Sequence, residues 1–286
     1  MVRAVQTISL VTNLSKFFKD ASKKECITLE IQHWDSFCQH DNVLFPIWHR
    51  FYCLRLEHAL ETVFLDGEVA LHYWDDKSIP KIRTQEEVLI DGVVQRNSLL
   101  DLVISRGIGT DPQCHFTKPY GYQTVRCPYS GIVGKMSKQH NESVKEKDEE
   151  YFPKNLEIWM HEKSMRSENG SVSELFKSCL ENDNYNTFSN NKSAGDDIAL
   201  EQPHDNVHIT VAGWGDLYAA EDDSPQRLVI EEAEGAHGDM GLNEFASFDP
   251  IFFLHHSNVD RVFWVWQKKW GHTEHIQVDK DSPCHT

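Results

Sequence analysis

The stretch DPIFFLHHSNVD, residues 249–260, decides the fold that the sequence predicts. Its Asp-Pro pair is typical of the start of a helix, and apolar residues continue at helical spacing over residues 262–266. His255 and His256 interrupt this apolar run as an adjacent pair. Two imidazoles therefore lie on a helix that is otherwise suited to burial.

The same helix places three chemically different side chains on one face. Phe252, His256 and Asp260 are four residues apart, so an aromatic ring, an imidazole and a carboxylate form one row. A buried imidazole needs partners for both of its nitrogens. A metal supplies one partner and a carboxylate such as Asp260 supplies another. The alternative is a pair of core histidines that are satisfied by their neighbours.

The composition is acidic and rich in histidine. The 286 residues carry 45 Asp plus Glu against 28 Lys plus Arg, a formal net charge of −17, so we expect neither nucleic acid nor an anionic membrane as a partner. The length suits one large domain or two small ones, and no internal repeat argues for more. The 16 histidines, many of them in short-range pairs, are typical of a metal protein.

The seven cysteines form no CxxC pair, which argues against zinc-ribbon or thioredoxin-like chemistry. The first residues are too often polar for a signal peptide, and no run approaches the roughly 20 apolar residues of a membrane-spanning helix. Four Asn-x-Ser sequons are compatible with secretion. The sequence therefore leaves the compartment open.

The hydrophobic pattern predicts helices joined by long loops. A strong helix is expected over residues 45–65, with Pro46 in its first turn. The weaker helical patterns cover residues 5–20, 153–162, 171–180 and 198–211, and the pattern over 26–37 is ambiguous. The expected irregular parts are loops with short apolar runs over 66–135, a charged surface segment over 136–151, a polar loop over 182–197 and a long loop over 213–238.

Three histidine pairs are candidates for a metal site: His40 with His49, His204 with His208, and His255 with His256. His204 and His208 are four residues apart on a predicted helix, so both rings project to the same side. A zinc-protease helix has Glu directly after the first His, and here that residue is Asp205, which weakens a zinc hydrolase interpretation. A site rich in imidazole and without a thiolate pair suits copper as well as zinc.

Two of these regions resemble a known family. Residues 40–50, HDNVLFPIWHR, with Glu57 downstream, resemble the first-copper motif of tyrosinases and molluscan-type haemocyanins. Residues 249–260 resemble their second-copper motif. Further segments are similar to the longer, fungal-like tyrosinases, also called polyphenol oxidases: residues 73–75, 118–126 and 184–190, so that the resemblance covers about residues 30–270.

This resemblance implies a set of copper ligands. His204 and His208 match the helical pair of the second copper, and His256, the second histidine of the doublet, matches its third ligand. His40 and His49 match two ligands of the first copper.

The third ligand of the first copper is a departure from the family. Members usually carry it well upstream on its own helix, but residues 1–32 contain no histidine. His33 is therefore the only candidate. Either His33 serves as the third ligand, or the first copper has two ligands and binds poorly.

Other positions also carry over from the family. Cys38 matches the cysteine that many members link to the adjacent ligand histidine by a thioether; the alternative is a free or disulfide-bonded thiol. Glu201 matches the glutamate proposed to hold a water that deprotonates the phenol. Asp205 follows the first ligand of the helical pair, where its effect is open, and a helix cap could equally explain both acids. Phe252 is expected to pack on His256.

The resemblance and the site together imply a mainly α fold. We expect an antiparallel four-helix bundle that holds a dinuclear copper site, with long loops and few short strands. Residues 1–286 are expected to form one tyrosinase-like domain, without the C-terminal β-rich domain of many long members.

The implied activity is the oxidation of phenols and catechols to o-quinones, with two copper ions, dioxygen and a small phenolic substrate. Two alternatives stay open. A haemocyanin-like oxygen binder shares the copper site but blocks substrate access, and the expected absence of the β-rich domain argues against it. A degenerate copper protein is disabled at the first metal because the upstream histidine is missing.

Overall fold

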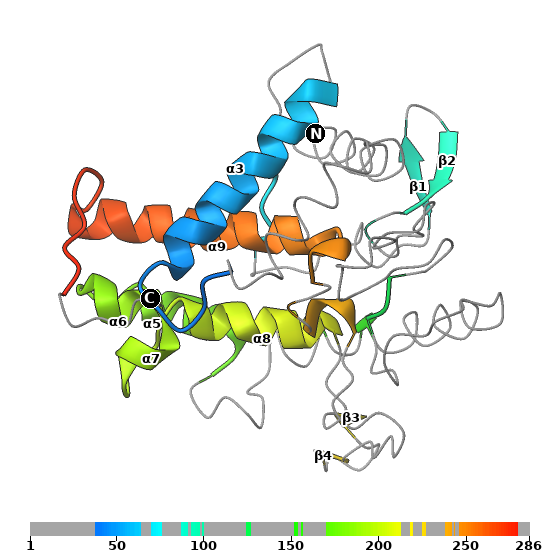
Figure 1. The fold of residues 1–286 in the computed structure, drawn as a ribbon. Helices are drawn as coiled ribbons and strands as arrows, with labels where there is room; N and C mark the ends of the chain where they lie inside the picture. The colour runs from blue at the N-terminus through cyan, green and yellow to red at the C-terminus, as the bar shows by residue number, and fades with distance from the viewer. Residues whose placement is uncertain are drawn as a thin grey trace, which may run out of the picture.

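The chain folds around three long helices. The computed structural model describes residues 38–63, 70–75, 87–90, 93–97, 99, 124–126, 152–153, 156, 170–212, 218–219, 225–226, 238–241, 243 and 246–279. Within these residues the chain is mainly helical, and its strands are few and short (Figure 1). The predicted mainly α class is therefore confirmed.

The longest helix, α9, spans Ile251–Trp270 and carries the histidine doublet. It begins directly after Pro250, and the Asp249 carboxylate accepts a hydrogen bond from the Ile251 N–H at 2.9 Å. At the other end Gly271 adopts a φ of 76°, the left-handed conformation that commonly closes a helix. The Asp-Pro pair that predicts this helix from sequence thus lies at its start.

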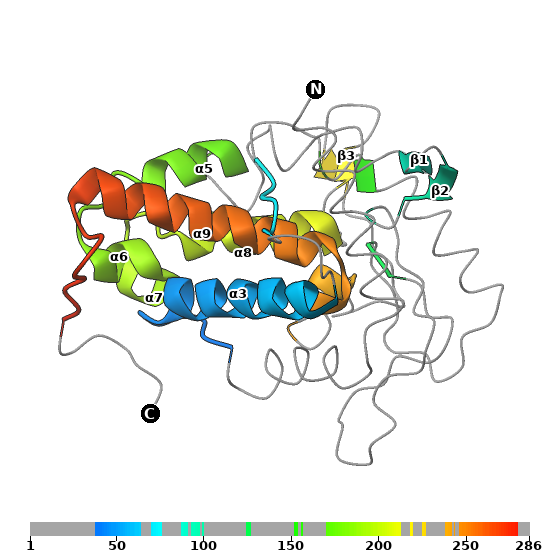
Figure 2. The same ribbon diagram turned by 90° about the horizontal axis from the view of Figure 1, so that it is seen from above.

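Helix α3, Phe45–Val63, lies antiparallel to α9, as the colour gradients of the two helices show in Figure 2. Its Tyr52 ring contacts Phe252 and Phe253 near the start of α9, with ring centroids 5.7 and 5.8 Å apart. The helix predicted over residues 45–65 is confirmed over most of its length. It brings the first-copper motif against the second.

Asp260 does not serve an imidazole. The Arg50 side chain of α3 donates from Nε to Asp260 Oδ1 and from Nη1 to Gln267 Oε1, the latter at 3.1 Å. The same guanidinium lies 4.3 Å above the centroid of the Phe263 ring. The predicted role of Asp260 as a histidine partner is wrong, because a long cationic side chain from the neighbouring helix reaches the carboxylate.

Helix α8, Glu201–Ala212, runs antiparallel to α9 and begins three residues later than predicted (Figure 1). Helix α5, Val172–Cys179, packs against α8 and confirms the helix expected there. It starts with a capping box, in which Ser171 and Glu174 satisfy each other's backbone N–H groups. The described part of the chain therefore has four helices, α3, α5, α8 and α9, that form the helical core; an antiparallel four-helix bundle stays a prediction.

The prediction of a polar loop over residues 182–197 is wrong. It contains two short helices, α6 (Tyr185–Ser189) and α7 (Asn191–Ala194). Asn184 and Asn190 cap these helices with their side chains, so polar residues typical of loops act here as helix starts. Phe188 anchors the segment to α9, where its ring stacks on a tryptophan at 4.5 Å.

Two antiparallel strand pairs complete the described elements: β1 (Glu87–Ile90) with β2 (Val93–Arg96), and β3 (Tyr218–Ala219) with β4 (Pro225–Gln226). The sequence predicted few and short strands, and the strands of the described residues agree with that prediction. The second pair lies within residues 213–238, so the prediction of a continuous loop is wrong for those strand residues.

A fully buried ion pair fixes the start of α9. Arg126 donates from Nε and Nη2 to the two carboxylate oxygens of Asp249, at 2.7 and 2.8 Å. Both side chains are 0% exposed. Since Asp249 also accepts from the N–H of Ile251, this pair connects residues 124–126 with the helix that carries the doublet.

Several predictions fall outside the described residues. These are the helix over 5–20, the ambiguous segment 26–37, the charged segment 136–151, His33 and most of the helix over 153–162. Residues 153 and 156 of that last segment are described, and both are helical. None of the helices that the structure describes is long and apolar enough to span a membrane.

Candidate metal centre

Histidines from three parts of the chain meet between α3, α8 and α9. The His49 ring of α3 stacks on the His256 ring of α9, with centroids 4.4 Å apart. His40, just before α3, lies 5.2 Å from His49 and 5.5 Å from His204 of α8. His204 is in turn 4.5 Å from His208. Every predicted histidine ligand within the described residues therefore joins one cluster.

The potential ligand atoms of this cluster form two groups, one with Cys38, His40 and His49 and the other with His204, His208, His255 and His256. Within each group the atoms lie within 4.8 Å of one another. The first group holds two of the predicted ligands of the first copper, with Cys38, and the second holds the three predicted ligands of the second copper. The second contains one more imidazole, that of His255, than the predicted ligand set.

Hydrogen bonds orient three of the rings. Nδ1 of His49 bonds to the Phe45 carbonyl at 2.8 Å, and Nδ1 of His208 bonds to the Met240 carbonyl at 2.6 Å. Because a carbonyl oxygen only accepts, each Nδ1 carries the proton and each Nε2 carries the lone pair. This arrangement is typical of metal-ligating histidines.

His204 follows the same rule with a carboxylate as its partner. Its Nδ1 donates to Asp205 Oδ1 at 2.9 Å, while its Nε2 is buried without a hydrogen-bond partner. A buried polar atom without a partner is costly in a protein interior. Close by, Nε2 of His208 lies 3.1 Å from Nε2 of His256. A cation that accepts these lone pairs satisfies the cluster, and imidazole nitrogens suit copper.

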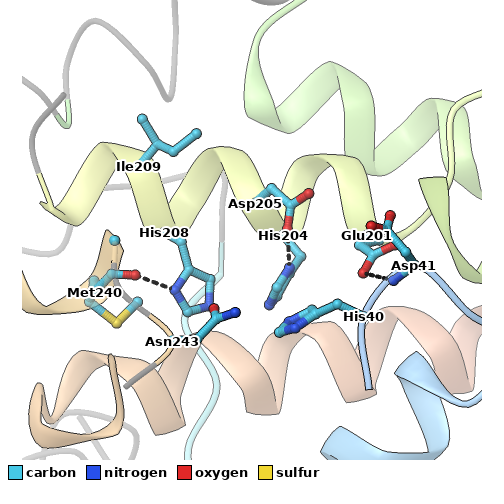
Figure 3. A pocket seen from close by; sticks show the side chains of 10 residues that line it. His40, Asp41, Glu201, His204, Asp205, His208, Ile209, Met240 and Asn243 are labelled. Carbon is cyan, nitrogen blue, oxygen red and sulfur yellow. Dashed lines mark hydrogen bonds and ion pairs between the residues drawn. The ribbon is translucent and has the colours of Figure 1, made fainter. Parts of the chain in front are cut away.

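A pocket of about 330 Å³ opens onto this cluster. Its lining residues come from the turn before α3, from α8 and from the loop around the 3₁₀ helix η2, Asp239–Gly241 (Figure 3). The histidines that line it are His40, His204 and His208. A small molecule in this pocket therefore contacts imidazoles of both groups.

Comparison with known proteins shows which family has this chain as a member. The model of the common central domain of tyrosinase matches residues 14–269. The chain belongs to the tyrosinase family.

The relatives of this chain include proteins named tyrosinases and proteins named hemocyanins. The chain is 36% identical to tyrosinase HcTyr2 of Hahella sp. (strain CCB-MM4), over 86% of this chain and 50% of that protein. It is 26% identical to hemocyanin 1 of Megathura crenulata, over 81% of this chain and 5% of that protein. The solved tyrosinase of Burkholderia thailandensis at high pH matches with 34% identity and a TM-score of 0.68, over 89% of this chain and 55% of that one. The chain spans about half the length of the curated tyrosinases that it matches.

Burial keeps the imidazoles of this tyrosinase-family site neutral. It lowers the pKa of His40 and of His208 to about 4, and that of His204 and His256 well below the usual range. Neighbouring imidazoles lower the pKa of His204 and His256 further. Since only the neutral ring has a free lone pair, the ligands are in the state that binds a metal at neutral pH.

We therefore expect the copper-free chain to lose stability in acid. The pKa of His208 is about 4 in the folded chain and about 6.5 when unfolded, so the unfolded chain binds more protons between these values. The stabilising effect of the neutral ring is complete above about pH 6.5 and declines as the pH falls toward 4, by on the order of 2 kcal/mol each for His208 and His40. The raised pKa of Glu201 acts in the opposite sense and offsets about one of these two histidines. Urea unfolding of the copper-free chain at pH 7 and pH 4.5 measures this loss of stability. Equal free energies of unfolding at both pH values would contradict the burial of neutral histidines.

Phenylalanine rings form the apolar wall of the site. Phe252 packs on His256 with ring centroids 4.1 Å apart, as the sequence predicted. Phe45 lies 4.7 Å from His49 and 4.8 Å from His204. These rings restrict the tilt of three imidazoles and keep water away from them.

Cys38 lies where a link to His40 is feasible. Its Sγ is 3.5 Å from Nδ1 and 3.9 Å from Nε2 of His40, so it faces the ring carbon between the two nitrogens. The same sulfur is 3.8 Å from Nε2 of His49. Burial raises the pKa of the Cys38 thiol well above its usual value, and so does the nearby Glu201.

The two acids predicted for the site occupy different places. Glu201 is buried, and its oxygens accept the backbone N–H groups of Asp41 and Asn191 at 2.8 and 2.9 Å. Burial raises its pKa to about 7. Asp205 accepts from His204 and, through Oδ2, from the Asn191 side chain at 2.8 Å. Burial raises the pKa of Asp205 well above its usual value, and the nearby Glu201 raises it further. The hydrogen bond from the Asn191 amide lowers this pKa and partly opposes both effects. Neither acid caps the N–H groups of its own helix.

The sequence did not identify several residues of the site. Met240 orients His208 through its carbonyl, a role that no side-chain pattern reveals. Its position depends on Gly238, whose N–H donates to the Ala212 carbonyl and where a Cβ would lie 2.5 Å from that oxygen. The copper motif assigned no role to Asp41, whose φ of 54° marks a left-handed turn of the kind found at functional sites.

Proposed function

We propose that this protein oxidises phenols and catechols to o-quinones with dioxygen, using two copper ions. One observation carries the proposal: a pocket of substrate size opens onto imidazoles whose Nε2 lone pairs converge from two ligand groups. The relatives named tyrosinases support the enzymatic interpretation.

The residues suit two adjacent copper sites. His204, His208 and His256 would hold the second copper, and His40 and His49 would hold the first. His33 stays the proposed third ligand of the first copper. When bound, the copper pair supplies the site for dioxygen and the electrons exchanged with the substrate.

The chain itself contributes orientation and proton transfer. The carbonyls of Phe45 and Met240 and the Asp205 carboxylate hold the ligand rings in one tautomer, so the rings need no reorganisation on binding metal. Glu201 is the proposed base, acting through a water: each of its oxygens accepts one N–H and keeps a second lone pair. Its pKa of about 7 suits accepting the phenol proton at neutral pH.

We also propose the thioether between Cys38 and His40. Its formation joins Sγ to the ring carbon between the two nitrogens and releases the thiol hydrogen and the ring hydrogen, with dioxygen as the oxidant. We expect the copper-loaded chain to be lighter than its sequence by two hydrogen atoms, with Cys38 no longer open to alkylation. Peptide mass spectrometry measures this. Cys53, which is buried in α3, is the control thiol, and an alkylated Cys38 with an unmodified His40 would contradict the link.

One experiment tests the function. Oxygenation of the copper-loaded chain is followed by its near-ultraviolet absorption band, and a monophenol or a catechol is then added. We expect a band followed by formation of o-quinone. A band without turnover would instead support a haemocyanin-like oxygen binder, and absence of a band would support a degenerate copper protein. His58→Ala is the matched control, because this histidine of α3 is exposed and outside the cluster.

A further inference from the structure

The pocket that opens onto the histidines has an unequal distribution of charge. Asp41, Glu201 and Asp205 contribute three carboxyl groups to its lining, and no lysine or arginine is among the lining residues. Figure 3 shows Asp41 and Glu201 together near the start of α8 and Asp205 one turn further along, above His204, whereas Ile209 and Met240 lie at the other end. The pocket thus has an acidic end and an apolar end.

The acidic end is held in place by hydrogen bonds and not by cations. The Asp41 backbone is tied to Glu201, and the Asp205 carboxylate accepts from the Asn191 amide. Asp41 is exposed, and the Asp205 side chain is 44% exposed. Among the described residues, no lysine or arginine forms an ion pair with any of the three acids; Lys192 on the neighbouring helix α7 is exposed and does not line the pocket. The charge of Asp41 is therefore available to a ligand.

The histidines of the pocket determine how a phenol would be oriented in it. Nε2 of His204 is buried without a hydrogen-bond partner, and the His204 ring lies in the pocket beside His40 (Figure 3). In the proposed function this atom would hold copper, so the reacting hydroxyl group would lie on the histidine side of the pocket. A phenol oriented in this way leaves its remaining ring substituent toward the solvent-exposed rim, where Asp41 and Asp205 lie.

We propose that Asp41, at the exposed rim of the acidic end, selects phenols that carry a cationic amine on the ring substituent over phenols that carry a carboxylate. The inference rests on the proposed function, and it adds the charge class of the substrate. An ammonium group gains attraction from the acidic rim, while a carboxylate meets like charge and, among the lining residues, no cationic partner.

The expected preference is moderate, because the rim is in contact with solvent. One exposed carboxylate changes binding by about two- to fivefold. Attraction of the amine and repulsion of the carboxylate together predict a kcat/KM ratio of about tenfold between the two substrates. Salt at about 0.5 M is expected to reduce this ratio, because it screens exposed charges.

Three phenols of nearly equal shape test the selection: tyramine, 4-ethylphenol and 3-(4-hydroxyphenyl)propionate, which are cationic, neutral and anionic at pH 7. We expect kcat/KM of the copper-loaded chain to fall in that order. Asp41→Asn is expected to lower the ratio of tyramine to 4-ethylphenol by about two- to fivefold. Glu274→Gln, at an exposed carboxylate outside the pocket, should leave this ratio unchanged.

A binding measurement separates the inference from the proposed function. 2-Phenylethylamine and 3-phenylpropionate lack the hydroxyl group, and calorimetry on the copper-free chain measures their affinities directly. Tighter binding of the amine, reduced by Asp41→Asn, supports the inference even if no phenol is oxidised. Oxidation of all three phenols with equal kcat/KM, or equal affinity for both ligands, would overturn the inference and leave the proposed function standing.

Discussion

His204→Ala is expected to lose the copper of the second group and to lower phenol oxidation by more than 100-fold. The estimate is a lower bound, because altering only the hydrogen-bond partner of a metal ligand costs about 10- to 100-fold in affinity or activity. The ring supplies a buried Nε2 that has no protein partner, so its function is to bind something that is not part of the chain. Metal content and oxidation rate measured on the same sample test this directly.

Two further variants show how large the effect of His204→Ala is by comparison. Asp205→Asn keeps the ligand but weakens the acceptor of its Nδ1 proton, so we expect an intermediate loss of about 10- to 100-fold. His58→Ala removes an exposed histidine of α3 and should change neither metal content nor rate. If His204→Ala retained both the metal and the activity, His204 would be a core residue and the ligand assignment would be wrong.

Asp249→Ala is expected to destabilise the fold by about 3–5 kcal/mol, the usual cost of leaving one charge of a buried pair without its partner. The Arg126 guanidinium is 0% exposed and donates two hydrogen bonds to this carboxylate. Urea unfolding of the copper-free chain measures the loss. It should occur without copper, since the cost comes from the unpaired buried charge of Arg126.

The matched double variant separates the buried charge from the packing. In Arg126→Met with Asp249→Leu no unpaired charge remains, so we expect it to be more stable than Asp249→Ala alone. Glu181→Ala removes the exposed bridge to Lys269 and should cost less than about 1 kcal/mol. A loss in Asp249→Ala as small as that in Glu181→Ala would contradict the proposed importance of the buried pair.

Local patterns were sufficient for the long helices and for the common face of one histidine pair. Helix α9 was predictable because an Asp-Pro start and helical spacing determine it within one segment. The spacing of His204 and His208 gave their common face in the same way. The pairing of the two copper motifs in space required the family resemblance, because no local pattern states which helices pack together.

Long-range contacts account for the errors. Asp260 is on the predicted face of α9, but Arg50 of another helix takes its carboxylate. Residues 182–197 were too polar to suggest helices, yet their asparagines act as caps once Phe188 is packed against α9. The carbonyl of Met240 is equally invisible in the sequence, because every residue has a carbonyl and only the fold decides which one reaches His208.

The copper content of the purified chain tests the central claim most directly. After reconstitution with copper and removal of loosely bound metal, native mass spectrometry counts the ions in each molecule. Two copper ions per chain are predicted, because the converging imidazoles form two ligand groups. A chain that retains a single copper ion, or none, would contradict the paired centre on which the proposed oxidation depends.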